Sequence, residues 1–204
     1  MSSKYNDSRS HTALPAASLR VRPEQALFHI SVSVEVEAAA AAMPLLRRAV
    51  ARLEDLLLAP TIASTLVVTD FDLPNEPGKL STPVARLHGR LEVPLPGGAF
   101  WERAQKIAAV DDMLRSLIVE GKKQKPQFEV RRDLPVFVVV NPEAHRPELV
   151  ARIHERARSL VADKGQPIVL RELRFDRPVE QRSVGLDQVE LSLNIDGCAE
   201  LTLT

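Results

Sequence analysis

The sequence predicts an α+β fold in which helices pack on mainly antiparallel sheets. Stretches that alternate apolar and polar residues, typical of strands, are interrupted by stretches with helical spacing. Their order is β-α-β-β, then a helix, then β-α-β-β again. Apolar residues make up 45% of the chain and charged residues 26%, which is an ordinary globular composition. We therefore expect two β-α-β-β units joined by a central helix.

The first unit is expected to begin near Pro23. Strict alternation from Phe28 to Glu37 indicates a strand with one buried face. Helical spacing follows to Leu58, with an apolar stripe formed by Leu46, Val50, Leu53 and Leu57. Two further strands are predicted over 61–73 and 80–95, separated by a turn with two prolines.

A helix over about 100–120 follows, and Gly121 is its expected C-terminal stop. The second unit then repeats the order of the first. Its predicted elements are a strand over 128–140, a helix over 147–164, a short strand over 168–175, a polar loop over 176–187 and a long strand over 189–203. That last strand is expected to bend at Gly197 and to cross between two sheets.

The domain organisation follows from where these patterns start. Residues 1–22 have no period and are rich in Ser, Arg and Ala, so they are predicted to be a flexible leader. Residues 23–204 form the predicted domain, with halves of about 23–97 and 127–204 joined by helix 100–120. No stretch approaches the roughly 20 apolar residues of a membrane span. Without a visible signal peptide a cytoplasmic chain is expected, or a periplasmic one if the true N-terminus has been removed.

The charge balance bears on the partners. Lys+Arg and Asp+Glu number 27 each, so the formal net charge is zero. Nucleic-acid binding usually needs a basic excess on one face, so nucleic acid is not the expected partner. Zero net charge also removes the long-range repulsion between copies, which favours self-association.

The sequence contains no recognisable catalytic or metal-binding motif. Its five histidines are not at metal-ligand spacing with one another, and neither CxxC nor HExxH occurs. The single cysteine, Cys198, lies on the polar face of a predicted strand with no cue for an activating base. Asp111 and Asp112 are adjacent in a predicted helix, where neighbouring side chains point apart. No catalytic residue, metal or cofactor is therefore predicted.

One group of polar residues is a candidate ligand site. His29, His88, Arg86 and Arg90 lie on the polar faces of two predicted strands. If these strands pair, the four side chains share a surface that could bind a small anion or a partner. The alternative interpretation is an ordinary solvated sheet face. The basic run Gly121–Lys125 after the central helix has two similar interpretations, a favourable contact with the helix dipole or an anionic partner.

With the order of elements established, the chain resembles the SIMPL domain family, whose members are mostly bacterial. The resemblance begins at Pro23-Glu24-Gln25-Ala26 and the alternating strand FHISVSVEVE, and continues with an Ala-rich helix. The segment Val68–Pro74 is similar to the family's Thr-Ser-x-x-Leu-x-Pro stretch. The helix ARIHERARSLVADKG and the terminal alternating strand match in order, so that the likeness spans roughly residues 21–204.

The resemblance implies a function without assigning a reaction. It implies helices packed on antiparallel sheets, a frequently periplasmic location, and in some members large ring-like or channel-like oligomers. It implies no enzymatic activity and supplies no catalytic residues. We therefore expect a non-enzymatic assembly or protein-interaction module that works as a homo-oligomer. The alternative is a small-molecule-binding module or enzyme with a pocket between sheet and helices.

Overall fold

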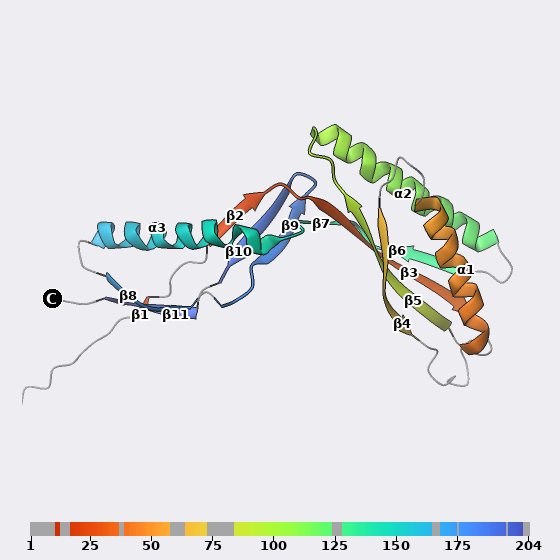
Figure 1. Ribbon diagram of the computed structural model, residues 1–204, viewed down its shortest axis with the longest axis horizontal. Coiled ribbons are helices and arrows are strands. Elements are labelled where there is room, and N and C mark those ends of the chain that lie inside the picture. The colour runs from red at the N-terminus through yellow and green to blue at the C-terminus, as the bar shows by residue number, and fades with distance from the viewer. Residues whose placement is uncertain are drawn as a thin grey trace, which may run out of the picture. The chain divides into compact units, whose positions relative to one another are not determined.

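The structure, a computed structural model, describes residues 11–12, 17–36, 39–57, 64–72, 84–123, 128–164, 168–174, 176–194 and 196–201 (Figure 1). The chain divides into two compact units. Residues 23–138 and 184–187 form the first, here called the central unit. Residues 1–22, 139–183 and 188–204 form the second, the terminal unit. The α+β class predicted from the sequence is confirmed, but the boundary between units lies elsewhere.

The central unit is a five-stranded antiparallel sheet with two helices. Along the chain it contains β3 (Gln25–Glu35), α1 (Ala39–Leu57), β4 (Thr65–Asp72), β5 (Val84–Pro94), α2 (Phe100–Lys123), β6 (Phe128–Arg132) and β7 (Val136–Val138). The strand order is β4-β5-β3-β6, and β7 also pairs with β3. A β-α-β-β-α-β chain with its first strand between the third and fourth has the ferredoxin-like, split β-α-β topology.

Both helices lie on the same side of this sheet (Figure 1), and the core fills the space between. Even-numbered residues of β3 point into it because side chains alternate along a strand. The core includes Phe28, Ile30, Val32 and Val34 of β3, Leu46 and Leu53 of α1, Leu91 and Val93 of β5, Leu114 and Leu117 of α2, and Val130 of β6. Among the residues that the structure describes, no helix of this unit lies on the other face of the sheet, and His29 and Arg86 on that face are exposed. This face is called the open face below.

A buried arginine ties α2 to the start of β3. Arg103 is fully buried, and its Nη2 donates a hydrogen bond of 2.7 Å to the carbonyl oxygen of Pro23. Its Nε lies 3.7 Å from Oδ1 of Asp187. Asp187 belongs to the hairpin tip 184–187, which is part of the central unit although its flanking strands belong to the terminal unit. A buried guanidinium needs such oxygen partners, since leaving it unpaired is costly.

The terminal unit contains two three-stranded sheets and a helix. Its elements are β1 (His11–Thr12), β2 (Ala17–Val21), the short helix η1 (Pro142–His145), α3 (Arg146–Lys164), β8 (Ile168–Arg174), β9 (Glu180–Gly185), β10 (Gln188–Leu193) and β11 (Asp196–Leu201). The sheets have the orders β1-β11-β8 and β2-β10-β9. Helix α3 packs against β2 and β10, and Leu149 and Ile153 on it are fully or almost fully buried.

The structure corrects the prediction of a flexible leader. Residues 17–21 form β2, which pairs with β10 in a continuous antiparallel register from Ala17↔Leu193 to Val21↔Val189. Ala17 and Leu19 are buried, while Arg20 is exposed. Five residues are too short for their alternation to stand out beside the Ser- and Arg-rich segment before them. Residues 1–10 and 13–16 lie outside the described residues.

The second predicted β-α-β-β unit is also corrected. The strand expected over 128–140 is interrupted at Asp133-Leu134-Pro135, where proline cannot donate a ladder hydrogen bond. The expected loop 176–187 contains β9, which joins β10 through the two-residue turn at 186–187. The long strand expected over 189–203 is two strands in different sheets, as its length suggested. The register of β11 shifts between Asp196 and Cys198, which places an irregularity at Gly197.

The expected joining role of the central helix is not observed, because α2 packs within the central unit against β6. Nor does the helix stop at Gly121, since it continues to Lys123. Gly121 is buried, and a Cβ built on it would lie 2.6 Å from the carbonyl oxygen of Phe128 and 2.7 Å from its ring. Glycine is therefore required for the close approach of α2 to β6. Within the described part of the chain, no helix is long and apolar enough to cross a membrane.

Candidate functional site

The register of β3 and β5 brings the four predicted site residues onto one surface. His29 is paired with Arg90, Ser31 with His88, and Ser33 with Arg86. The neighbouring residues Ile30, Val32 and Val34 are buried beneath the helices, so these six side chains belong to the open face. The expectation that the two strands pair is confirmed.

Two of these side chains are held by carboxylates on the same face. Nε2 of His88 lies 3.1 Å from Oδ2 of Asp72, which comes from the adjacent strand β4. Nε of Arg90 donates a hydrogen bond of 3.0 Å to Oε1 of Glu92, two residues further along β5. Arg90 therefore has its charge matched within its own strand.

A first hollow contains both histidines. It has a volume of about 200 Å³ and is lined by His29, Ser31, Thr69, His88, Arg131 and Asp133, with the backbone of Ile30 and Gly89. The backbone N–H of Asp133 donates a hydrogen bond of 3.0 Å to the carbonyl oxygen of His29, which fixes the end of β6 beside β3. This hollow is small, and most of its lining side chains are polar.

A second, larger hollow lies further along the same face, at the other end of β3. Its volume is about 760 Å³, and its lining residues are Ser33, Glu35, Val84, Arg86, Lys122, Phe128, Glu129 and Arg131. Glu129 accepts a hydrogen bond of 2.9 Å from Nε of Arg131. That bond lowers the pKa of Glu129, and the nearby charges of Lys122 and Arg86 act in the same direction. The same bond raises the pKa of Arg131.

The predicted group is therefore one surface but not one pocket. His29 and His88 share the smaller hollow, Arg86 lines the larger one, and Arg90 is paired with Glu92. Sequence reasoning missed Ser33, Glu129 and Arg131 as members of the surface. The alternation of β6 already placed Glu129 and Arg131 on its polar side, but only the register shows that Glu129 lies opposite Ser33.

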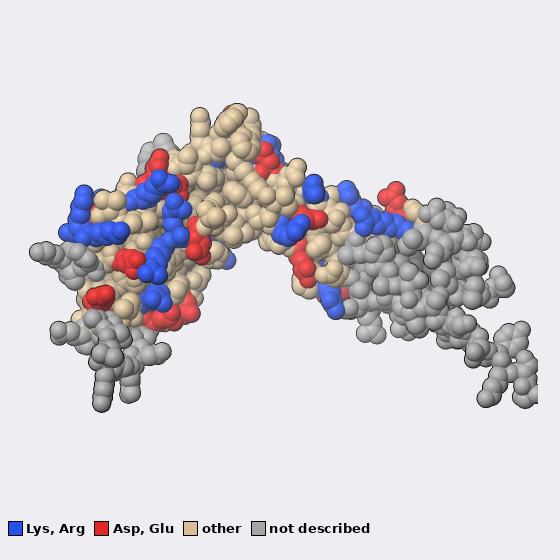
Figure 2. Space-filling view, turned by 180° about the vertical axis from the view of Figure 1, so that it is seen from behind, with Lys and Arg blue, Asp and Glu red and all other residues tan. Residues whose placement is uncertain are grey.

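The open face carries both signs of charge. Figure 2 shows basic side chains gathered on one face of the central unit, with acidic side chains among and beside them. Among the described residues no group of three or more His, Cys, Asp or Glu side chains is placed to hold a metal ion. Cys198 lies in β11, opposite Arg171 of β8 in the terminal unit. The chemistry that the open face offers is ion pairing and hydrogen bonding.

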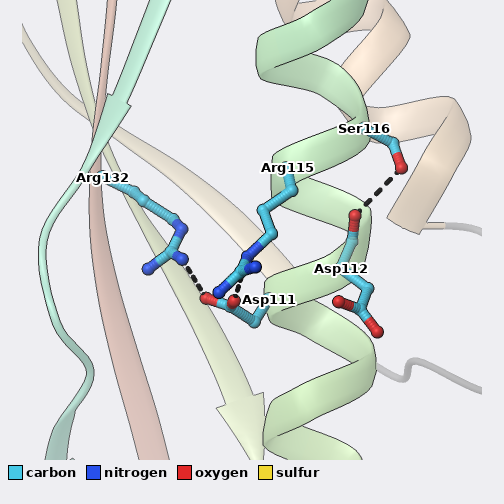
Figure 3. A network of polar contacts seen from close by, with 5 residues as sticks. All are labelled: Asp111, Asp112, Arg115, Ser116 and Arg132. Atoms are coloured by element: carbon cyan, nitrogen blue, oxygen red, sulfur yellow. Dashed lines mark hydrogen bonds and ion pairs between the residues drawn. The ribbon is translucent and has the colours of Figure 1, made fainter.

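A polar cluster on the helix side is structural in character (Figure 3). Asp111 of α2 accepts a hydrogen bond of 2.7 Å from Nε of Arg115 and forms an ion pair with Arg132 of β6. Asp112 points away from Asp111, as adjacent helix positions predict, and its backbone oxygen accepts a hydrogen bond of 3.0 Å from Ser116 Oγ. The two aspartates therefore do not form an acid–base pair. Their cluster fastens α2 to the edge strand of the sheet.

The first turn of α2 exposes an aromatic pair. The rings of Phe100 and Trp101 pack edge to face, with centroids 5.2 Å apart and planes at 83°. Trp101 is the only tryptophan of the chain, and 73% of it is exposed, while 43% of Phe100 is exposed. The two rings exposed side by side form an apolar surface that a partner could cover.

The fold and surface define an α+β protein whose central unit has the ferredoxin-like strand order. No family model matches the sequence, and it has no significant match among curated proteins. Among solved structures it is similar to an amidase of the hydantoinase/carbamoylase family from Burkholderia phymatum, with 16% identity and a TM-score of 0.35. The similarity covers 65% of this chain and 35% of the amidase chain. At this TM-score the likeness supports neither a shared fold nor a shared activity.

Proposed function

We propose that this chain is a non-enzymatic protein-interaction module of SIMPL type that works as a homo-oligomer. The observation that carries the proposal is the exposed Phe100–Trp101 pair at the start of α2. Tryptophan is enriched among the residues that dominate binding energy at protein interfaces, because a large rigid ring buries much area at low entropic cost.

The charges support a second copy as the partner. The formal net charge is zero, so copies do not repel one another at long range. The proposal also agrees with the resemblance in the sequence, since oligomers are found in the SIMPL family. A contact between identical copies that follows a two-fold axis would place the same aromatic pair on both sides of the interface.

The alternative function requires a different location for its pocket. That alternative places a ligand pocket between sheet and helices, but in the central unit this space contains the apolar core. The hollows at His29 and at Arg86 lie on the opposite, open face. A small-molecule site in the central unit would therefore lie on the open face.

The test is the molar mass of the full chain in solution, measured by light scattering coupled to size exclusion across micromolar concentrations. We expect an oligomer for the wild type. The dissociation constant of the Trp101→Ala oligomer should be higher by about ten-fold or more, because truncating a central interface residue typically costs about 2 kcal/mol. Since Trp101 is exposed in the monomer, the far-UV circular dichroism spectrum of the variant should match that of the wild type.

Val119→Ala is the matched control, because Val119 is an exposed apolar residue near the other end of α2. Its oligomer should have the stability of the wild type. A wild-type chain that stays monomeric at every concentration contradicts the proposal. An oligomer that Trp101→Ala leaves unaltered would contradict the assignment of the aromatic pair to the interface.

A further inference from the structure

We propose that the larger hollow of the open face is a binding site for a small anionic molecule, held by Arg86, Lys122 and Arg131. The hollow is called the anion hollow below. It is a site for a phosphate or carboxylate group carried by a small organic molecule, and it is independent of the self-association proposed above.

Three cationic side chains reach the anion hollow from three different elements. Arg86 comes from β5, Lys122 from the last turn of α2 and Arg131 from β6. The floor between them is Ser33 of β3, which is paired with Arg86 on one side and with Glu129 on the other. The fold thus concentrates positive charge that is spread over 46 positions of the sequence, from 86 to 131.

Two of the three cations have no ion-pair partner among the described residues. Within the part of the chain that the structure describes, neither Arg86 nor Lys122 forms an ion pair or a side-chain hydrogen bond. Arg131 is bonded to Glu129. Ser33, at the bottom of the anion hollow, is 9% exposed, and its hydroxyl can donate a hydrogen bond to an oxygen of a ligand.

The site already stabilises a negative charge. The carboxylate of Glu129 lies among the three cations, and its pKa is lowered first by the hydrogen bond from Arg131 and further by Lys122 and Arg86. An anionic ligand placed beside it would experience the same cations. Glu129 itself, with Glu35 on the rim, would repel that ligand and compete for Arg131. The affinity should therefore rise when the charge of Glu129 is removed.

The size and lining of the hollow indicate the class of ligand. A volume of about 760 Å³ lies within the range of small-molecule sites. Guanidinium groups match the paired oxygens of carboxylates and phosphates, and an ammonium adds a point charge. Val84 supplies an apolar side chain to the lining, which also includes the almost fully buried Phe128. A small anion with a short apolar part fits all of these features.

The experiment is a titration of the isotope-labelled full chain with inorganic phosphate and, separately, with acetate, at constant ionic strength. Amide resonances of Ser33, Arg86 and Glu129 should shift in a saturable way with at least one probe. Saturation with phosphate alone assigns a phosphate headgroup, and saturation with acetate alone assigns a carboxylate. Both results support the site.

Charge variants make the test specific. The double variant Arg86→Ala/Lys122→Ala should weaken binding by about five-fold or more, as expected for the loss of two partly exposed charge contacts. Glu129→Gln should tighten it several-fold. The control Arg47→Ala/Arg48→Ala removes the same net charge from exposed positions of α1, on the other side of the sheet, and should not change the affinity.

Three results would overturn the inference. The first is that neither probe produces saturable shifts, and the second is that the shifts are spread evenly over the surface. The third is that Arg86→Ala/Lys122→Ala and the control Arg47→Ala/Arg48→Ala bind the probe with equal affinity. A monomeric chain that still binds anions in this way would contradict only the self-association, so the two proposals fail separately.

Discussion

At the scale of single residues, the clearest constraint is the glycine at the contact of α2 and β6. The sequence pattern marks Gly121 as a helix stop, because glycine commonly ends helices. In the structure its missing side chain instead makes room for the backbone and ring of Phe128. A glycine that ends a helix and a glycine that makes room for a neighbour look identical in a single sequence. What distinguishes them here is Phe128, which packs against Gly121 in the folded protein.

Replacing Gly121 with alanine should destabilise the protein by about 1–3 kcal/mol, because the new Cβ would meet the Phe128 carbonyl 2.6 Å away. Alanine has the higher helix propensity, so a stabilising effect would be expected if only the helix mattered. Gly97→Ala is the control, since a Cβ there meets nothing within 4 Å. Urea unfolding of both variants measures the difference. Equal midpoints would show that α2 can move away from β6 at little cost.

At the scale of elements, the attachment of α2 to β6 depends on one carboxylate. Asp111 bonds Arg115 in its own helix and Arg132 in the strand. Arg132 is only 17% exposed at its side chain, so this pair is screened less by solvent than a surface pair would be. The sequence shows Asp111 and Asp112, but it does not show that Arg132 of β6 forms an ion pair with the first of them.

Asp111→Ala should therefore lower the free energy of unfolding by about 1–2 kcal/mol, and a double-mutant cycle with Arg132→Met should give a coupling of about 1 kcal/mol. Asp112→Ala serves as the comparison, because Asp112 is exposed and its carboxylate points away from the cluster. It should change stability by less than about 0.5 kcal/mol. A coupling near zero would mean that apolar packing alone holds the helix.

The order β-α-β-β-α at the start of the central unit could be predicted from periodicity, but the partition of the candidate site could not. Alternation placed His29, Arg86, His88 and Arg90 on polar strand faces, and strand pairing made these faces one surface. The two hollows arise from partners on other elements. Lys122, from a helix, lines the same hollow as Arg86, and Asp133, from a loop, lines the same hollow as His29. Which residues of different elements line one hollow depends on strand register and on the position of the helix, and periodicity contains information on neither.

At the scale of the whole molecule, the sequence of the central unit is inserted into the sequence of the terminal unit. Periodicity identified a repeat of β-α-β-β, whereas the structure groups segments from both ends of the chain into the terminal unit. The prediction of a flexible leader was wrong over residues 17–21 for the same reason. The partner of β2 is β10, and nothing local in residues 17–21 points to a strand so distant in sequence.

Leu19 tests this organisation, because it is buried in β2 opposite Leu191. Leu19→Ala should destabilise the terminal unit by about 2–4 kcal/mol, as a truncated core leucine does. Hydrogen exchange should accelerate in β10 and α3 but remain slow in β3 and β5, which have a core of their own. Arg20→Ala, exposed on the same strand, should leave exchange unchanged. Identical exchange in both variants would support the flexible leader instead.

The pairing of β2 with β10 also sets an order of events during synthesis. Leu19 leaves the ribosome long before its neighbour Leu191, whereas β3 to β7 are complete once Val138 has emerged. Domains fold as units while the chain is still being made, so the central unit is assembled during translation around its own core. Strand β2 must remain unpaired throughout that time. The terminal unit can therefore close only once β10 has emerged, which makes β2 the strand of the nascent chain that needs protection until then.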